Sequence, residues 1–359
     1  MNLPFRIQTE AGTEPVIAVD GAFDAPGLHL SHWPGNRTPE DLRHELSTGS
    51  ALRFSALDAA ERARRAEGCV AVANNHYDTD GCLAALAVLR PEWALAHRER
   101  LLDAAAAGDF FRAPSREAVA IDAAITNLCD PGRSPLELDG LSDTERYEAA
   151  TRAAFERVPL WLDGGLERDA QLFEPEVAAW EADAQDLDGA LFDDLVHLDY
   201  AVWTAAIDRS STRADAAGWD PGRHALFGAT LADRVLTLGP GAEGTRARFL
   251  LSTASWFDLP ERRPHPRPDL AALAEQLNAV EGTASDADVR WRHQRQEGAS
   301  PELWFGTEAL PLFAEHAGAA LRPSGLDPDR IKHLVTEAVR TAWSFSDDPE
   351  DDDGDWYVV

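Results

Sequence analysis

Three side chains that can bind a metal ion occupy alternate positions within residues 70–89. His76, Asp78 and Asp80 follow a short apolar run, residues 70–73, and Gly81 comes directly after them. Residues 82–89 are apolar and rich in helix-forming types. The pattern predicts a strand, a tight loop and the start of a helix. In an extended loop, alternate side chains point the same way, so the three donors would face one space.

The donor types in this loop restrict the ion that they could hold. An imidazole with two carboxylates suits Mn²⁺, Fe²⁺, Zn²⁺ or Mg²⁺ rather than an ion that prefers thiolates. The following helix N-terminus favours a bound anion such as phosphate. In a simpler interpretation, Asp78 and Asp80 are turn and N-cap residues and His76 is incidental. Ligands of open α/β sheets bind at the carboxyl ends of strands, which favours the metal interpretation.

Other candidate ligands follow the remaining predicted elements of the N-terminal region. Asp20 ends a strand at residues 15–19, and His32 lies near the end of a second strand at 28–33. Asp109 follows a predicted helix over 91–107, which we expect residues 108–110 to break. If the sheet is parallel, these side chains could stand beside the loop and complete a metal site. A turn-forming Asp, a packed His and a solvated Asp at a helix end are the alternatives.

The order of predicted elements indicates an α/β fold with two parts. Residues 1–134 form a mostly parallel sheet with flanking helices, including helices at 38–46 and 55–67. Residues 135–188 form a helical connecting layer that opens with a capping box at Ser142 and Glu145. Residues 189–345 form a smaller α+β domain with a mainly antiparallel sheet, and residues 346–359 are an acidic tail.

The loop resembles a motif of a known enzyme family. His76-Tyr77-Asp78-Thr79-Asp80-Gly81 looks like the H-x-D-x-D-G motif of the DHH-type phosphoesterases. The resemblance implies that His76, Asp78 and Asp80 bind one or two Mn²⁺ ions. The chain has no His-His pair, so the family's Asp-His-His run is absent. Residues 28–35 and 267–281 are also similar to an uncharacterised bacterial family that carries the same acidic loop.

Composition limits the partners of the protein. Its 359 residues include 63 acidic and 33 basic ones, a formal net charge of −30, which repels long nucleic acids. Three cysteines are too few for a disulfide framework. The sequence contains no transmembrane stretch and no visible secretory signal, so we expect a cytoplasmic protein.

These observations favour a metal-dependent hydrolase of a phosphoester or phosphoanhydride. A divalent metal, Mn²⁺ first and Fe²⁺, Zn²⁺ or Mg²⁺ next, would activate water, and His32 or His224 would act as an acid–base group. His32 could instead be a ligand. The expected substrate is a small phosphorylated compound or a nucleotide, and the chain could form a homo-oligomer. The alternatives are a non-phosphate hydrolase, an iron-dependent oxygenase, or a non-catalytic scaffold.

Overall fold

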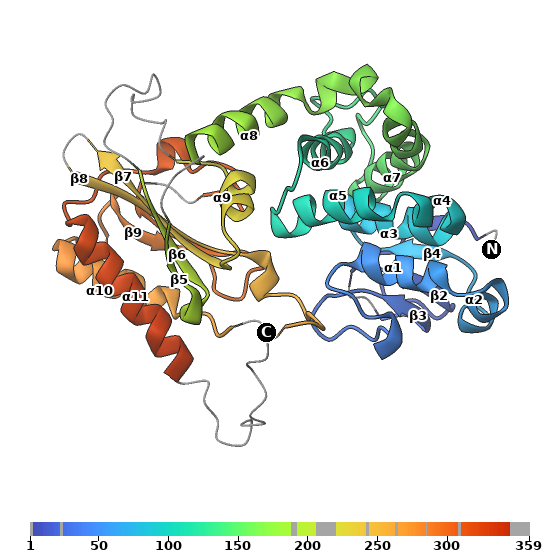
Figure 1. Cartoon of the computed structure of the whole chain (residues 1–359), viewed down its shortest axis with the longest axis horizontal. Helices are drawn as coiled ribbons and strands as arrows, with labels where there is room; N and C mark the ends of the chain where they lie inside the picture. The colour runs from blue at the N-terminus through green and yellow to red at the C-terminus, as the bar shows by residue number, and fades with distance from the viewer. Residues whose placement is uncertain are drawn as a thin grey trace. The chain divides into compact units, whose positions relative to one another are not determined.

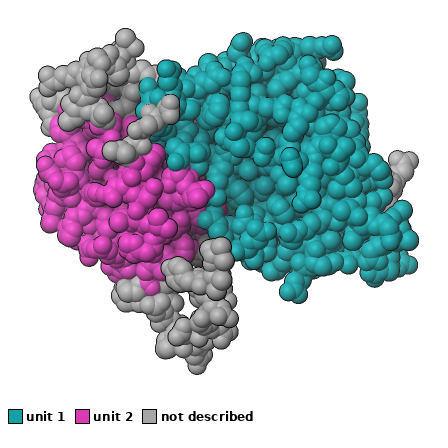
Figure 2. Space-filling view, in the orientation of Figure 1, with its two compact units in different colours: residues 1–188, 222–229, 256–264 teal, residues 189–221, 230–255, 265–359 magenta. Residues whose placement is uncertain are grey.

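Segments from distant parts of the sequence assemble into two units in the computed structural model (Figures 1 and 2). The structure describes residues 3–21, 24–187, 192–205, 220–241, 244–262, 265–284, 286–307 and 310–344. Unit 1 comprises residues 1–188, 222–229 and 256–264, and unit 2 comprises the rest of the chain. Residues 135–188, predicted as a separate helical layer, belong to unit 1. The predicted acidic tail, 346–359, lies outside the described residues.

Unit 1 is built on a four-stranded sheet whose paired strands all run parallel. The strand order is β1 (Phe5–Ile7), β4 (Val72–Asn74), β2 (Val16–Val19) and β3 (Gly27–Leu30). All four residues of β2 are fully buried, as expected for a strand covered on both faces. Because the strands are parallel, the loops after β2, β3 and β4 leave the same edge of the sheet.

The helices of unit 1 position the loops at that edge. α3 (Thr79–Leu89) is buried from Thr79 to Val88, and its alanines let α1 (Ser47–Ala56) approach closely. The other helices are α2 (Ala59–Arg65), α4 (Pro91–Ala96), α5 (Arg98–Phe110), α6 (Arg116–Leu128), α7 (Asp143–Leu160), α8 (Glu174–Leu187) and α9 (Arg223–Ala229). Shorter turns are η1 (Glu40–Leu42), η2 (Trp161–Gly165) and η3 (Leu166–Leu172). The capping box predicted at the start of α7 is confirmed.

Several helix boundaries differ from the sequence prediction. The helix expected over 91–107 is two helices, α4 and α5, separated at His97. The helix expected over 38–46 is only the single turn η1, and the helix expected over 55–67 is two helices, with Asp58 capping the second. The start of α1 is set by a tertiary interaction, since the amides of Ser47 and Thr48 donate hydrogen bonds to the carboxylate of Asp80 in the first turn of α3. Gly108 does not end α5; a Cβ there would lie 2.8 Å from Asp122 Oδ1, so glycine permits close packing inside the helix.

Unit 2 contains a six-stranded mixed sheet. Its order is β5 (Phe192–Leu195), β6 (Tyr200–Thr204), β7 (Arg234–Gly241), β8 (Gly244–Leu251), β10 (Glu302–Gly306) and β9 (Arg290–His293). All pairs are antiparallel except β6 with β7, so the sheet is mainly antiparallel, as predicted. The short turns are η4 (Val196–Leu198), η5 (Thr253–Ser255) and η6 (Gly318–Ala320).

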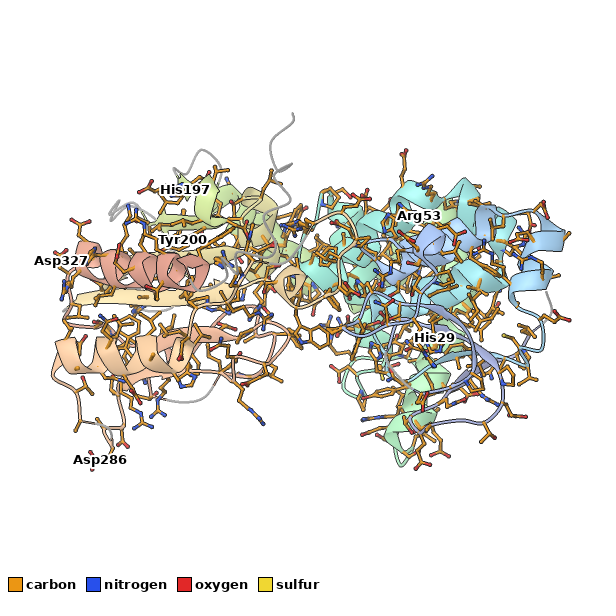
Figure 3. The ribbon with its side chains drawn as sticks, turned by 90° about the horizontal axis from the view of Figure 1, so that it is seen from below. His29, Arg53, His197, Tyr200, Asp286 and Asp327 are labelled. Carbon is orange, nitrogen blue, oxygen red and sulfur yellow. The ribbon has the colours of Figure 1, made fainter. Side chains whose placement is uncertain are left out.

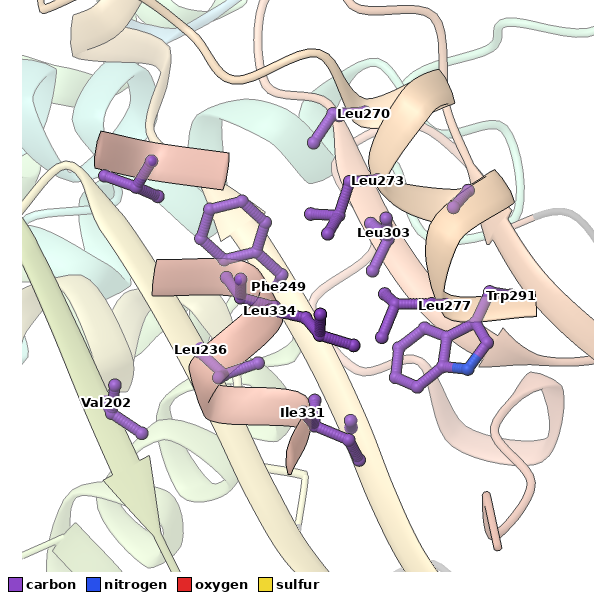
Figure 4. Packing of buried hydrophobic residues seen from close by; sticks show 14 of the residues in the cluster. Val202, Leu236, Phe249, Leu270, Leu273, Leu277, Trp291, Leu303, Ile331 and Leu334 are labelled. Carbon is purple, nitrogen blue, oxygen red and sulfur yellow. The ribbon is translucent and has the colours of Figure 1, made fainter. Parts of the chain in front are cut away.

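Two amphipathic helices complete the core of unit 2. α10 (Leu270–Glu281) begins at the N-cap Asp269, and α11 (Pro328–Ser344) is the last described helix. Leu273 of α10 and Leu334 of α11 pack with Phe249 of β8 in one buried cluster (Figure 4). The predicted fold class is therefore confirmed: unit 1 contains a parallel sheet with flanking helices, and unit 2 contains a mixed sheet with helices.

Among the described residues, no helix is both long enough and apolar enough to cross a membrane.

Candidate metal centre

Six side chains of unit 1 converge at the carboxyl edge of its parallel sheet. Their ligand atoms form two groups, and within each group all the atoms lie within 4.8 Å of one another. The first group, called here the inner group, contains Asp20, His32, Asp80 and Asp109; the second, the outer group, contains Asp20, His76 and Asp78. Asp20 belongs to both groups. The structure thus brings together all five predicted metal ligands and one of the two predicted acid–base residues.

Asp20 lies between the two groups because of its backbone conformation. It follows β2 with φ of 60°, a left-handed conformation in which Asp and Asn are the commonest residues after glycine. Its side chain is fully buried, and Oδ1 accepts a hydrogen bond from Ser47 Oγ at 2.8 Å. Oδ1 lies 3.5 Å from His32 Nε2, and Oδ2 lies 3.0 Å from His76 Nε2. One carboxylate therefore faces both imidazoles.

His32 presents its Nε2 atom to the inner group. Its Nδ1 lies 2.5 Å from the backbone carbonyl of Glu45, so Nδ1 carries the proton that it donates. Nε2 lies 3.0 Å from Asp109 Oδ2 and 3.7 Å from Asp80 Oδ2, yet it makes no hydrogen bond of acceptable geometry. A buried imidazole held through Nδ1–H, with Nε2 aimed at carboxylates, is the usual arrangement of a metal-binding histidine.

His76 repeats this arrangement in the outer group. Its Nδ1 lies 2.7 Å from the side-chain oxygen of Asn75, and its Nε2 lies 2.7 Å from Asp78 Oδ2. The side chains of His76 and Asp78 are 25% and 34% exposed, whereas those of Asp20 and His32 are fully buried. The outer group is therefore the part of the site that solvent reaches.

The N-termini of two helices fix the loop carboxylates. Asp78 caps α3, because its Oδ1 accepts a hydrogen bond from the Gly81 amide at 2.8 Å. Its other oxygen faces His76, so the N-cap interpretation and the ligand interpretation hold for the same residue. Asp80 accepts hydrogen bonds from the amides of Ser47 and Thr48, at 2.7 and 2.8 Å, at the start of α1.

The close approach of these charges shifts their pKa values. Burial raises the pKa of Asp20, but interactions with His32 and His76 outweigh it and lower that pKa far below its usual value. Burial and the charge of Asp20 raise the pKa of Asp80 to about 6. Burial and Asp80 raise the pKa of Asp109 well above its usual value.

The two imidazoles shift in the opposite sense to the one that burial favours. Burial lowers the pKa of His32, but Asp109, Asp20 and Asp80 raise it well above its usual value. Burial likewise lowers the pKa of His76, and Asp78 and Asp20 outweigh it to raise that pKa. Both shifts show that the site strongly favours positive charge at the two Nε2 positions.

His224, the second predicted acid–base residue, belongs to neither group. Its Nε2 lies 3.4 Å from Asp122 Oδ2, and Asp122 Oδ1 accepts a hydrogen bond from Thr79 Oγ1 at 2.5 Å. Thr79 stands between the ligand candidates of the loop. His224 thus lies behind the start of α3, in a second layer around the site. His29, labelled in Figure 3, also belongs to neither group; its Nε2 lies 2.9 Å from the Ala25 carbonyl oxygen.

Sequence reasoning missed the groups that hold the ligands in place. Ser47, Thr48, Asn75 and the Glu45 carbonyl orient the carboxylates and imidazoles. Backbone amides and carbonyls leave no residue-type pattern, so only the Ser-Thr pair after an apolar Leu could have suggested a helix start.

The pKa shifts predict that the metal-free protein loses stability as the pH rises. Asp80, with its pKa raised from 3.8 to about 6, binds a proton more tightly in the folded state, as do Asp109 and both histidines. Stability from such groups is complete below the unfolded-state pKa and is lost as the pH rises through the folded-state pKa. Urea denaturation in a chelator should show the unfolding free energy of unit 1 falling from about pH 5 to about pH 8.

Asp109→Asn should make this fall shallower, because it removes one of the responsible carboxyls. Asp163→Asn, at an exposed position, is the matched control and should leave the slope unchanged. An unfolding free energy that stays constant or increases over this pH range in the wild-type protein would contradict the assignment.

Gly81 is predicted to be essential to the geometry of the site. A Cβ at this position would lie 2.1 Å from Asn74 Nδ2 and 3.1 Å from Asp20 Oδ2. Gly81→Ala should therefore displace the Asn74 side chain and crowd Asp20. We expect it to weaken Mn²⁺ binding, measured by titration calorimetry, by about 10- to 100-fold, as changes to residues that support metal ligands do. Gly228→Ala, at an exposed helical glycine with room for a Cβ, is the control. Equal Mn²⁺ affinity in both variants would show that Gly81 has no such role.

Comparison with known proteins places the chain in a family without assigning it an activity. No curated protein matches the sequence. A family model described as a family of unknown function, DUF6687, matches residues 1–350. Since this match covers nearly the whole sequence, the chain belongs to the DUF6687 family.

Proposed function

We propose that the protein is a metal-dependent hydrolase that acts on a phosphoester or phosphoanhydride. One observation carries the proposal: six carboxylate and imidazole side chains, from loops and helices far apart in the sequence, converge in two groups that share Asp20. Two adjoining ligand groups with a shared carboxylate suit a pair of divalent ions.

The electrostatics of the groups support a bound cation. Asp20, Asp80 and Asp109 are buried together, and buried carboxylates at this separation repel one another. Without a cation, the pKa shifts indicate that protons must be taken up to offset that repulsion. Divalent ions would offset it while leaving both Nε2 atoms free of protons, as metal ligation requires.

The donor set supports Mn²⁺ as the ion, with Fe²⁺, Zn²⁺ or Mg²⁺ as the other candidates. Every donor is oxygen or nitrogen; the nearby Cys82 thiol is buried and lies 3.7 Å from Thr151 Oγ1 instead. Each group contains only one histidine. Non-haem iron oxygenases use two histidines and one carboxylate, so the carboxylate-rich groups favour a hydrolase over that alternative.

The motif at the loop adds support from resemblance. His76, Asp78 and Asp80 match the H-x-D-x-D-G pattern of the DHH-type phosphoesterases, although the chain lacks their Asp-His-His run. In our proposal Asp20, His32 and Asp109 supply the ligands that this run would provide. His32 then acts as a ligand rather than as an acid–base group.

The proposed chemistry follows from the charge and exposure of the site. Bound divalent ions would lower the pKa of a coordinated water and neutralise charge on the phosphoryl oxygens. Because only the outer group is partly exposed, the substrate would approach beside His76 and Asp78. His224, through Asp122 and Thr79, would hold the start of α3 in position. A net charge of −30 disfavours long nucleic acids, so we propose a small phosphorylated compound or a nucleotide as substrate.

Metal content tests the two-group model directly. After dialysis against Mn²⁺, elemental analysis should find about two ions per wild-type chain. Asp20→Asn, which keeps the backbone preference of the position, should lose both ions because both groups share that residue. His32→Gln should lose the inner ion and His76→Gln the outer one.

Asp163→Asn serves as the control, since Asp163 is an exposed acid outside both groups and should leave the metal content unchanged. The same variants are then assayed on p-nitrophenyl phosphate, its diester, pyrophosphate and nucleotides, and activity should vanish with Asp20→Asn. If wild type and Asp20→Asn contain equal amounts of metal, or none, the hydrolase proposal is wrong.

A further inference from the structure

Three aromatic rings form a continuous series between the imidazoles of the two histidines of the site. Phe257 stacks on His32, with ring centroids 3.8 Å apart and planes 18° apart. Trp256 contacts Phe257 at 5.2 Å and Trp33 at 5.1 Å, and Trp33 contacts His76 at 5.0 Å. We call Phe257, Trp256 and Trp33 the aromatic arc. It joins the imidazole of the inner group to that of the outer group.

Hydrogen bonds hold the two segments of the arc together. The Asp258 amide donates to the His32 carbonyl at 2.8 Å. Asn36 Nδ2 donates to the Trp33 carbonyl at 2.9 Å and to Asp258 Oδ2 at 3.2 Å. These hydrogen bonds hold residues 32–36 beside residues 256–258 within unit 1.

Burial varies along the arc. Phe257 and His32 are buried, whereas Trp33 and Trp256 are only half-buried. Trp33 also contacts His76, which belongs to the partly exposed outer group. The half-buried part of the arc thus adjoins the side of the site that solvent reaches. Phe257 alone is sufficient to stack on His32. Packing against His32 therefore does not explain the two half-buried indoles near the outer group.

We propose that Trp33 and Trp256 form a subsite for a planar, uncharged aromatic ring of the substrate. This inference rests on the proposed function, because it places the phosphoryl group of the same substrate at the metal groups. Stacking on tryptophan requires no charge on the ring. It could therefore contribute to binding although the net charge of the protein, −30, opposes the phosphate anion. The substrate class is therefore a small phosphoester with an aromatic group.

Two kinds of substrate could supply such a ring, and they would contact different tryptophans of the aromatic arc. An aryl group bonded directly to the phosphate oxygen would reach Trp33, the ring adjacent to His76. A nucleobase, which a ribose separates from its phosphate, would reach one ring further, to Trp256. Dependence on Trp256 therefore distinguishes a nucleotide from a simple aryl phosphate.

The experiment compares AMP, phenyl phosphate and ribose 5-phosphate on the Mn²⁺-loaded full-length protein. For a nucleotide, Trp256→Leu should lower the ratio of kcat/KM for AMP to that for ribose 5-phosphate by about tenfold or more. Trp256→Phe should restore most of the ratio. Trp93→Leu is the matched control, since Trp93 is also half-buried and stacks on a histidine, His97, outside the site.

Each outcome decides a different claim. A loss confined to phenyl phosphate, and seen with Trp33→Leu, would assign the subsite to an aryl group. Ratios that Trp256→Leu and Trp33→Leu leave unchanged would overturn the subsite while the hydrolase stands.

Calorimetric binding separates the subsite from the reaction. Suppose that no phosphoester is hydrolysed, but that AMP binds at least about tenfold more tightly than ribose 5-phosphate and loses this advantage in Trp256→Leu. The subsite proposal would then be upheld and the hydrolase proposal would be wrong. Equal binding of AMP, phenyl phosphate and ribose 5-phosphate to the wild type would overturn the subsite whatever the catalytic result.

Discussion

Four carboxylates, three of them buried together, impose the main electrostatic constraint on unit 1. Taking such charges out of water is costly unless each is met by donors or by positive charge. The fold meets part of the requirement with the Ser47 and Thr48 amides, the Ser47 hydroxyl and two oriented imidazoles. These donors are neutral or become charged only by taking up protons, so the set lacks a permanent positive charge. A divalent cation is the simplest species that supplies it, and this explains why the same residues that strain the metal-free fold would stabilise the loaded one.

The geometry of the sheet explains how so many chemically active residues meet. The strands are short, and parallel pairing places the loops that follow β2, β3 and β4 at one edge of the sheet. Asp20 and His32 follow adjacent strands, and the acidic loop follows the strand on the other side of β2. α5 then brings Asp109 to the same place from a position 29 residues beyond Asp80 in the sequence. The loops at the edge of the sheet supply most of the ligand candidates, and the helices α3 and α5 supply Asp80 and Asp109.

Much of this arrangement could be predicted from residue types, and the rest depended on tertiary contacts. The alternation in 76–80 and the turn residues after each apolar run indicated both the strands and the candidate ligands. The start of α1 was mispredicted because the Asp80 carboxylate, not a local capping residue, satisfies its first amides. Gly108 was interpreted as a helix breaker, whereas its small size serves contact with Asp122. In the aromatic arc, Trp33 contacts Trp256, which is more than 200 positions away in the sequence, and no local sequence pattern predicts such a contact.

Two independent constraints, the left-handed backbone and the ligand chemistry, restrict which residue can occupy position 20. Its φ of 60° favours glycine, asparagine and aspartate, because the Cβ of other residues crowds the neighbouring backbone in this conformation. The site between the two imidazoles then requires a carboxylate, which only one of those three supplies. Backbone sterics and ligand chemistry therefore favour the same amino acid for separate reasons, and few substitutions at this position would satisfy both.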